Sequence, residues 1–251
     1  MDDIKIITVD ENNVSEYGFY CSKNPKYEGY QLKLDWLKQR FTEGLKIKLL
    51  QSNSEGPIGF IEYIPGEYAW RVVDASGYLV IHCIYVVSKK DRSKGYGSLL
   101  LNDCIEDAKK MKKSGVAVVT SDKAMMAEKG LFLKNGFEVV DKVERFELLV
   151  KQLKKVPLPR FKDWEKERSK YKGLNLIYAN QCPYHKKAVS AICEASEEKG
   201  FQVKVFEIKD AKDAQNAPSI YGVFCLVHDG KLLADHYISK TRFQNILNKE
   251  L

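Results

Sequence analysis

The sequence lacks an apolar run of the roughly 18 residues that a membrane-spanning helix needs. Its first residues, MDDIKIITVDENN, are acidic and lack the apolar centre of a signal peptide, so we expect neither export nor a membrane partner. The six cysteines form no C-x-x-C pair and no histidine spacing that is typical of zinc. We therefore expect no bound metal, reduced thiols and a cytoplasmic protein.

An even spread of basic charge is also missing. The net charge is +7, but residues 151–173 alone hold 9 basic and 3 acidic side chains, which accounts for nearly all of the excess. A nucleic-acid-binding protein more often spreads basic charge over a folded face that also carries aromatic platforms. We therefore predict a solvated basic linker over 151–173 and no nucleic-acid partner.

A glycine loop between a strand and a helix is the most informative stretch that is present. Residues 92–97 form an R-x-x-G-x-G motif directly after the apolar run 78–87, whose Val, Ile and Tyr content favours a buried strand. Gly95 and Gly97 let the backbone turn sharply and approach a ligand closely. The helix predicted next carries apolar residues at Leu99, Leu100, Ile105 and Ala108.

The start of this helix predicts a pyrophosphate site. The amides of residues 93–98 point outward from a helix N-terminus, where the helix dipole also favours an anion. Lys89, Lys90, Arg92 and Lys94 add positive charge beside it. The familiar phosphate loop G-x-x-x-x-G-K-[ST] is absent, and a Rossmann fingerprint would need a glycine at Leu100.

The order of these elements resembles a known family. A strand, R-x-x-G-x-G and a helix, followed by a strand at 116–120 and LFLKNGFEVV at 131–140, resemble the acyl-coenzyme A-binding core of the GNAT superfamily of N-acetyltransferases. The resemblance implies a mixed α/β acyltransferase fold over residues 1–150, with acetyl-CoA as co-substrate and an amine as acceptor. It also implies cofactor contacts from Tyr85, Val86, Val87, Arg92, Ser93, Lys94, Gly95, Tyr96, Gly97 and Ser98.

Two residues are candidates for removing a proton from the acceptor ammonium. Glu62 lies on the strand predicted at 57–64, and His82 lies on the strand that precedes the glycine loop. A histidine titrates near neutral pH without much tuning. Each residue has a second interpretation: His82 as a core histidine bonded to the backbone, and Glu62 as a solvent-facing strand residue.

The position of the usual general acid departs from the family pattern. Members commonly place a tyrosine four residues before the glycine of the Gly-Phe pair, and here that residue is Phe132, which cannot donate a proton. Water, Tyr96 or an unprotonated thiolate departure would have to serve instead. Alternatively, catalysis is lost and the protein is a non-catalytic acyl-CoA sensor.

A second domain is predicted after the basic linker. Composition suits a globular protein of two domains, and 174–251 reads as βαβ followed by ββα, the order of a smaller thioredoxin-like α/β domain. Cys182 lies where thioredoxins carry C-x-x-C, and Ala217-Pro218 lies where they keep a cis-proline. The C-terminal residues also resemble the YoaP-type domain attached to some acetyltransferases.

Cys182 is a possible reactive thiol. It precedes a predicted helix, and the helix dipole together with His185 and Lys186 would favour the thiolate. No resolving cysteine stands at 185, and Cys193 lies about 16 Å along the same helix, too far for a disulfide. A thiol-dependent redox or soft-ligand-binding protein is therefore an alternative function, and a packing or recognition module is the plainer interpretation of this domain.

Other expectations concern the surroundings of the site. The loop 66–77, with Tyr68, Trp70 and Arg71, could line an acceptor pocket or cover the core, and Cys83 and Cys225 are expected to act as small core hydrophobes. Helices are predicted at 30–41, with Leu34, Leu37 and Phe41 in the core, and at 124–134, ended by Asn135-Gly136. Neither the acceptor nor the oligomeric state follows from the sequence.

Overall fold

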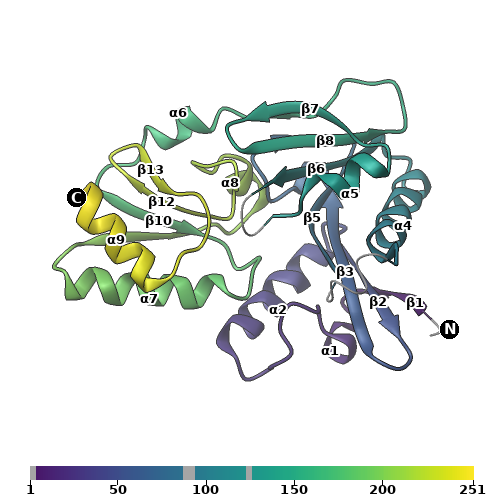
Figure 1. Ribbon diagram of the computed structural model, residues 1–251, viewed down its shortest axis with the longest axis horizontal. Helices are drawn as coiled ribbons and strands as arrows, with labels where there is room; N and C mark the ends of the chain where they lie inside the picture. The colour runs from purple at the N-terminus through teal and green to yellow at the C-terminus, as the bar shows by residue number, and fades with distance from the viewer. Residues whose placement is uncertain (1–3, 87–93, 123–125) are drawn as a thin grey trace. The chain divides into compact units, whose positions relative to one another are not determined.

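The structure is a computed structural model that describes residues 4–86, 94–122 and 126–251 (Figure 1). The chain divides into two compact units. The N-terminal unit comprises Met1–Lys23, Leu37–Ala69 and Val73–Phe161, and the C-terminal unit comprises Asn24–Trp36, Trp70–Val72 and Lys162–Leu251. Two short segments from the first third of the chain therefore group with the C-terminal residues. The domain limits at 150 and 174 stay a prediction.

The N-terminal unit is built on a seven-stranded sheet, with the order β1-β2-β3-β5-β6-β8-β7 in the described part of the chain. Its strands are β1 (Ile4–Val9), β2 (Lys46–Ser52), β3 (Gly56–Pro65), β5 (Leu79–Val86), β6 (Gly115–Ser121), β7 (Glu138–Val143) and β8 (Phe146–Gln152). The neighbours are antiparallel except β5 and β6, which run parallel. The strands predicted at 57–64, 78–87 and 116–120 are confirmed as β3, β5 and β6 over the described residues, with small shifts at their ends.

Helix α4 (Tyr96–Lys110) supplies much of the apolar core beside this sheet. Its buried apolar side chains recur at helical spacing and are Leu100, Leu101, Cys104, Ile105 and Ala108. They pack against apolar side chains of β3, β5 and β6. The expected helix is confirmed, but Leu99 is 44% exposed and does not belong to the core.

Helix α5 (Lys129–Lys134) is shorter than predicted. Residues 126–128 are not helical, and residues 123–125 lie outside the described part of the chain. The predicted stop is confirmed, because Gly136 follows the helix with a φ of 76°, the left-handed backbone that glycine favours. Helix α1 (Val14–Tyr17) and the 3₁₀ turn η1 (Gly66–Tyr68) are further helical elements of this unit.

The predicted basic linker is partly ordered. Strand β9 (Arg160–Phe161) pairs antiparallel with β4 (Val73–Asp74). Helix α6 (Trp164–Arg168) follows, and the Asp163 carboxylate accepts a hydrogen bond from the Lys166 amide at its start. The segment predicted as a basic linker therefore contains a short strand and a short charged helix.

The C-terminal unit contains a four-stranded sheet with the order β11-β10-β12-β13. Its strands are β10 (Leu174–Tyr178), β11 (Val203–Glu207), β12 (Phe224–His228) and β13 (Lys231–Ala234). β10 pairs parallel with β11 and antiparallel with β12, and β12 pairs antiparallel with β13. All five residues of β10 are buried, and four of them are apolar or aromatic, while the Asn175 amide donates hydrogen bonds to the Lys172 and Gly173 carbonyls.

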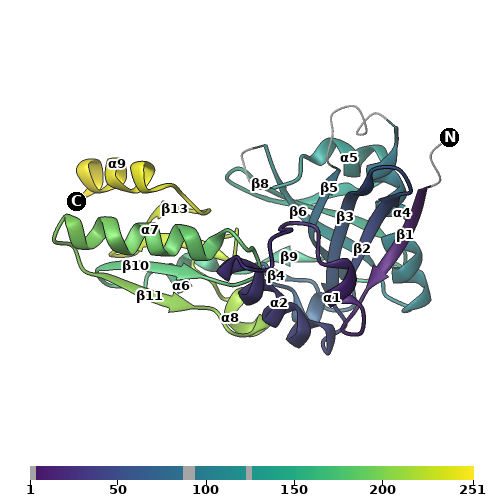
Figure 2. The ribbon, with the colours of Figure 1, turned by 90° about the horizontal axis from the view of Figure 1, so that it is seen from below.

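Helix α7 (His185–Glu198) packs on this sheet and contacts a second long helix, α9 (Lys240–Glu250). The two helices lie side by side (Figures 1 and 2). Helix α8 (Ala211–Gln215) was not predicted, because five residues are too few to show a helical period. The described residues contain no cis peptide bond, so Pro218 is trans and the expected cis-proline is not found.

Helix α2 (Glu28–Phe41) contributes residues to both units. Leu34 and Leu37 are buried as predicted, whereas Phe41 is only partly buried. Among the residues described, no helix combines the length and apolar character needed to cross a membrane.

Candidate active site

Strands β5 and β6 part at one end. Their register pairs Leu79–Ile81 with Val116–Val118, although β5 continues to Val86 and β6 to Ser121. On its other side β5 stays paired with β3 as far as Val86. The predicted cofactor residues Tyr85 and Val86 therefore lie at the end of β5 that has separated from β6. Val87 lies outside the described residues.

The glycine loop enters α4 with the backbone that the motif predicts. Gly95 has a φ of 81° and its carbonyl accepts a hydrogen bond of 3.0 Å from the Leu99 amide. A Cβ on Gly97 would lie 3.2 Å from the Leu131 side chain, so a larger residue would press against α5. Lys94, Tyr96 and Ser98 are also described, whereas Arg92 and Ser93 lie outside the described residues.

A bulge in β5 decides which side chains share a face. Glu62 of β3 pairs with Cys83, but the next residue, Tyr63, pairs with Ile81, so His82 is an extra residue on β5. Ile81 and Ile84 both belong to the core beside α4. His82 and Cys83 therefore both lie on the opposite face, together with Glu62.

The two candidate bases contact each other at this bulge. Nδ1 of His82 lies 3.3 Å from Oε1 of Glu62, and both residues are buried, with 6% and 3% exposed. The interpretation of Glu62 as a solvent-facing residue is therefore wrong. A carboxylate beside one ring nitrogen orients the imidazole and stabilises its protonated form, which suits a histidine that accepts a proton at the other nitrogen.

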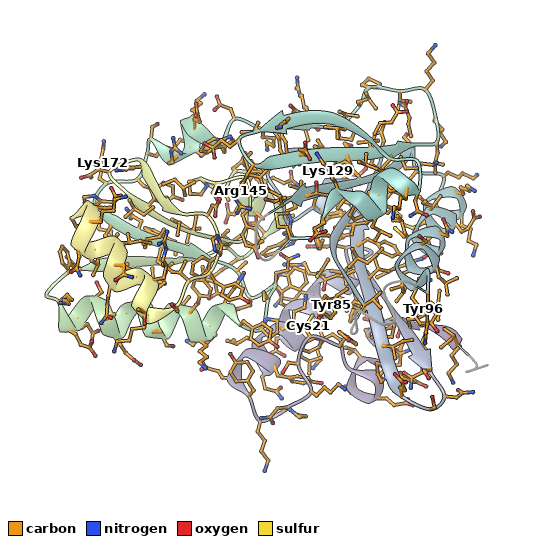
Figure 3. The ribbon with its side chains drawn as sticks, in the orientation of Figure 1. Cys21, Tyr85, Tyr96, Lys129, Arg145 and Lys172 are labelled. Carbon is orange, nitrogen blue, oxygen red and sulfur yellow. The ribbon has the colours of Figure 1, made fainter. Side chains whose placement is uncertain are left out.

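Aromatic side chains lie on the same face of the sheet. Tyr20 stacks on Phe60 at 5.1 Å between ring centroids and lies 6.2 Å from Tyr85. Burial is the main reason why the pKa of Tyr20 is raised to about 12, and the neighbouring Tyr85 and Cys21 raise it further. The phenol of Tyr20 therefore stays neutral. Figure 3 shows Cys21 and Tyr85 in the same region. No sequence pattern indicated a role for Tyr20, because it lies in a loop with a φ of 72°.

Phe132 is a core residue. It is fully buried and packs edge-on against Phe137 with 5.5 Å between ring centroids. No hydroxyl stands at this position, so the departing thiolate cannot receive a proton here. Tyr96, the alternative donor, lies in the first turn of α4 and is partly buried.

A buried charged network fixes α4 to the sheet. Asp107 accepts hydrogen bonds from Lys46 at 2.8 Å and from the Tyr63 hydroxyl at 2.7 Å, and Lys48 lies 3.3 Å away. Burial alone would raise the pKa of this carboxyl, but these donors and positive charges outweigh burial and lower it to about 2. Side chains of β2 and β3 thereby fix the position of α4, the helix that follows the glycine loop.

A polar hollow of about 470 Å³ lies beside the end of β6 and was not predicted from the sequence. Arg145 donates a 2.6 Å hydrogen bond to the Ser121 hydroxyl, and Glu147 pairs with Lys129 at 2.8 Å. Figure 3 labels Lys129 and Arg145. These charged side chains thus partly satisfy one another.

The surroundings of Cys182 differ from those expected. His185 is fully buried, with Nδ1 2.8 Å from the Ala179 carbonyl oxygen, and burial, helped by Arg71 and Lys33, lowers its pKa to about 4. His185 is therefore neutral at neutral pH, and the expectation that it is a cation beside Cys182 is wrong. Lys186 lies 3.4 Å from Glu28. The reactivity of Cys182 stays a prediction that rests on the start of α7.

Of the remaining expectations for cysteines and for the loop 66–77, some are confirmed and one is wrong. Cys225 is buried as expected, but Cys83 is exposed, because the β5 bulge turns it away from the core. In the loop 66–77, Trp70 is fully buried against Trp36, with 5.0 Å between ring centroids, so it covers a core. Tyr68 is 44% exposed. The described residues contain no cluster of three His, Cys, Asp or Glu that could hold a metal.

Arg71 and Gly29 connect the early segments to the Cys182 loop inside the C-terminal unit. The buried Arg71 donates hydrogen bonds to Gln181 at 2.9 Å and to the Trp70 carbonyl at 2.7 Å. A Cβ on Gly29 would lie 2.0 Å from the Pro183 carbonyl oxygen, so α2 approaches this loop as closely as a glycine allows.

Comparison with known proteins identifies the family. A model of the acetyltransferase (GNAT) family matches residues 8–137, just over half of the chain, and a YoaP-like model matches residues 202–245. The chain therefore belongs to the GNAT acetyltransferase family. The predictions of an N-acetyltransferase that uses acetyl-CoA, and of a YoaP-like C-terminal region, are confirmed at this level.

A curated relative matches nearly the whole chain, and solved structures match about three-fifths of it. "Uncharacterized N-acetyltransferase YoaP" of Bacillus subtilis is 28% identical over 249 residues, covering 96% of this chain and 98% of its own. A GNAT-family acetyltransferase of Staphylococcus aureus Mu50 is 18% identical over 61% of this chain and 100% of its own, with a TM-score of 0.44. A GNAT-family acetyltransferase of Elizabethkingia anophelis with acetyl-CoA bound is 21% identical over 61% of this chain and 100% of its own, with a TM-score of 0.39.

Proposed function

We propose that Glu62 and His82 together remove the proton from an amine acceptor that attacks acetyl-CoA. The observation that carries the proposal is their 3.3 Å contact at the β5 bulge, next to the separated ends of β5 and β6. The amine nitrogen needs a lone pair to attack the thioester carbon, and an amine is mostly protonated at neutral pH. His82 takes this proton, and Glu62 stabilises the imidazolium that forms.

Acetyl-CoA is proposed to lie along the end of β5. Its pyrophosphate binds the amides before α4, where the left-handed Gly95 starts the helix. Its pantetheine arm runs back beside Tyr85 and Val86, whose strand has separated from β6. Backbone amides at this strand end can polarise the thioester carbonyl as negative charge develops on its oxygen. Val87, Arg92 and Ser93 remain part of the proposed site on the sequence motif alone.

The absence of a tyrosine at Phe132 favours a second candidate, an acyl-CoA sensor without turnover. Release of coenzyme A in the presence of an acceptor separates the two candidates. An enzyme releases many equivalents of coenzyme A with at least one amine of a broad panel, whereas a sensor binds acetyl-CoA and releases none.

The base is tested by the pH dependence of kcat/KM in Glu62→Gln and His82→Asn. General base catalysis contributes typically about 10²–10⁴-fold, so we expect losses of that order and a flattened acidic limb of the profile. Glu55→Gln is the control, because Glu55 is an exposed carboxylate in the turn before β3. Unchanged profiles in both folded variants would show that neither residue is the base.

The C-terminal residues are proposed to form a thioredoxin-like domain with a recognition role. The order of β10 to β13 and the position of α7 support this fold, whereas the trans Pro218 departs from its usual pattern. The redox and soft-ligand alternative depends on Cys182, and it has lost the support of a cation at His185. A cytoplasmic location remains a proposal from the cysteine pattern.

A further inference from the structure

Three aromatic side chains lie beside the candidate base on the same face of the sheet. Phe60 of β3 pairs with Tyr85 of β5, and Glu62 pairs with Cys83, so these pairs form successive rows of this face. The ring of Tyr20 stacks on Phe60 at 5.1 Å and lies 6.2 Å from the ring of Tyr85. We call Tyr20, Phe60 and Tyr85 the aromatic shelf.

Two rings of the aromatic shelf are accessible to a ligand. Tyr85 is 44% exposed and Tyr20 is partly exposed, whereas Phe60, on which Tyr20 stacks, is buried. The planes of Tyr20 and Tyr85 are tilted by 46° to each other. A third aromatic ring can therefore contact both of them within the roughly 4.5–7 Å between centroids that aromatic pairs prefer.

The backbone of Tyr20 has an unusual conformation. Its φ of 72° lies in the left-handed region, which is unfavourable for a tyrosine and readily adopted by a glycine. Strain of this kind persists where surrounding contacts hold the residue, and it is concentrated at functional sites. Stacking on Phe60 is such a contact. An aromatic side chain is thus kept at this position at a cost in stability, as expected where the ring itself binds a ligand.

The charge and polarity around the base determine which acceptors fit. The strand register places Leu49 beside Phe60 and Ile47 beside Glu62, so the neighbouring side chains from β2 are apolar. The Glu62 carboxylate attracts the ammonium form of an amine and repels a second carboxylate. An amino acid carries a carboxylate next to its amine and would bring both to Glu62. The site therefore favours an amine whose other end is apolar and aromatic.

The proposed cofactor path and the aromatic shelf lie on different sides of β5. β5 pairs with β3 along one edge and has separated from β6 along the other, and the pantetheine arm is assigned to the separated edge. The aromatic shelf instead spans β3 and β5 on one face of the sheet. Acceptor and cofactor can therefore bind at the same time, as direct attack of the amine on acetyl-CoA requires.

We propose that the acceptor site binds an arylalkylamine, with its aromatic ring against Tyr20 and Tyr85 and its amine at His82 and Glu62. The inference rests on the proposed function, which places the base at this pair. Two residues of an extended strand span roughly 7 Å, a distance that a short alkyl chain between ring and amine covers. The aromatic shelf thus determines which amine binds, and the base removes its proton.

Steady-state kinetics with saturating acetyl-CoA test the proposal on the full-length protein, with phenethylamine, ethylamine and phenylalanine as acceptors. Burial of the ring should raise kcat/KM for phenethylamine at least about tenfold above that for ethylamine. The value for phenylalanine should also be lower, because its carboxylate is repelled by Glu62.

Variants of Tyr20 show whether the aromatic shelf is the cause. Tyr20→Gly removes the ring and supplies a residue that favours the observed φ. Its KM for phenethylamine should rise roughly two- to tenfold, the range for one aromatic pair, with little change in kcat or in the KM for ethylamine. Tyr20→Phe keeps the ring and should behave as the wild type. Tyr17→Ala is the control, because Tyr17 is an exposed tyrosine of α1 only three residues away in sequence.

Calorimetric titration of phenethylamine into protein saturated with coenzyme A separates this inference from the proposed function. Ethylamine or phenylalanine acetylated as efficiently as phenethylamine, or an unchanged KM in Tyr20→Gly, would overturn the inference although the protein acetylates amines. Phenethylamine that binds the wild type, binds Tyr20→Gly more weakly and releases no coenzyme A would confirm the aromatic site and overturn only the proposed turnover. Neither binding nor turnover of phenethylamine would overturn the inference.

Discussion

Burial of His185 predicts that the C-terminal unit loses stability in mild acid. The pKa of His185 falls from 6.5 to about 4, chiefly because a charged imidazole would be cut off from water. Between these values the unfolded chain binds a proton that the folded chain does not, so stability is complete above pH 6.5 and decreases as the pH falls towards 4. The full loss corresponds to about 3 kcal/mol, and about 2 kcal/mol of it is reached by about pH 5.

Tryptophan fluorescence is the appropriate assay. All three tryptophans, Trp36, Trp70 and Trp164, belong to the C-terminal unit, so their signal follows that unit. With a urea dependence of about 1–3 kcal/mol per molar, a loss of about 2 kcal/mol lowers the urea midpoint by roughly 1 M between pH 7 and pH 5.

The variant His185→Asn isolates the cause. The asparagine amide can still donate to the Ala179 carbonyl but cannot titrate, so the midpoint should change much less with pH. His228→Asn is the control, because His228 is only partly buried and lies beside Asp229. If His185→Asn keeps the full pH dependence of the wild type, the burial of a neutral imidazole is not its cause.

Two further predictions concern packing. Asp107→Asn should lower the unfolding free energy at pH 7 by at most about 2 kcal/mol, from the fall of its pKa from 3.8 to about 2, and this difference should fade as the pH falls through that interval. Unfolding followed by circular dichroism checks it, and an equal loss at pH 2 would contradict the assignment. Gly29→Ala should destabilise the C-terminal unit, because its Cβ would lie 2.0 Å from the Pro183 carbonyl, whereas Gly130→Ala in α5 meets nothing within 4 Å and should be neutral or stabilising. Equal tryptophan-monitored midpoints for the two glycine variants would refute the close approach.

Strands, turns and motifs made of consecutive residues could be predicted from the sequence. The strand predicted from the apolar run 78–87 is β5, whose described bounds differ from the prediction by one residue at each end, and Gly95 was predicted to have a special backbone conformation, which its φ of 81° confirms. The family resemblance could likewise be predicted from the sequence, because the glycine loop that carries it is one short run of consecutive residues.

Features that depend on register or on distant segments could not be predicted in this way. The exposure of Cys83 follows from a bulge that appears only when β5 is paired with β3. The neutral His185 follows from complete burial and from Arg71 and Lys33, which are far away in sequence. Single residues with polar or reactive side chains carry no periodic signal that would place them on one face or the other.

The most direct test of the acetyl-CoA site is thermal unfolding with and without acetyl-CoA for the wild type, Gly97→Leu and Gly130→Leu. Ligand at about 100 times its dissociation constant adds about 2.7 kcal/mol to the folded state. We predict that this stabilisation appears in the wild type and in Gly130→Leu, and is lost in Gly97→Leu, whose side chain would crowd Leu131 beside the start of α4. Equal stabilisation of all three proteins, or none in the wild type, would contradict a cofactor site at this loop.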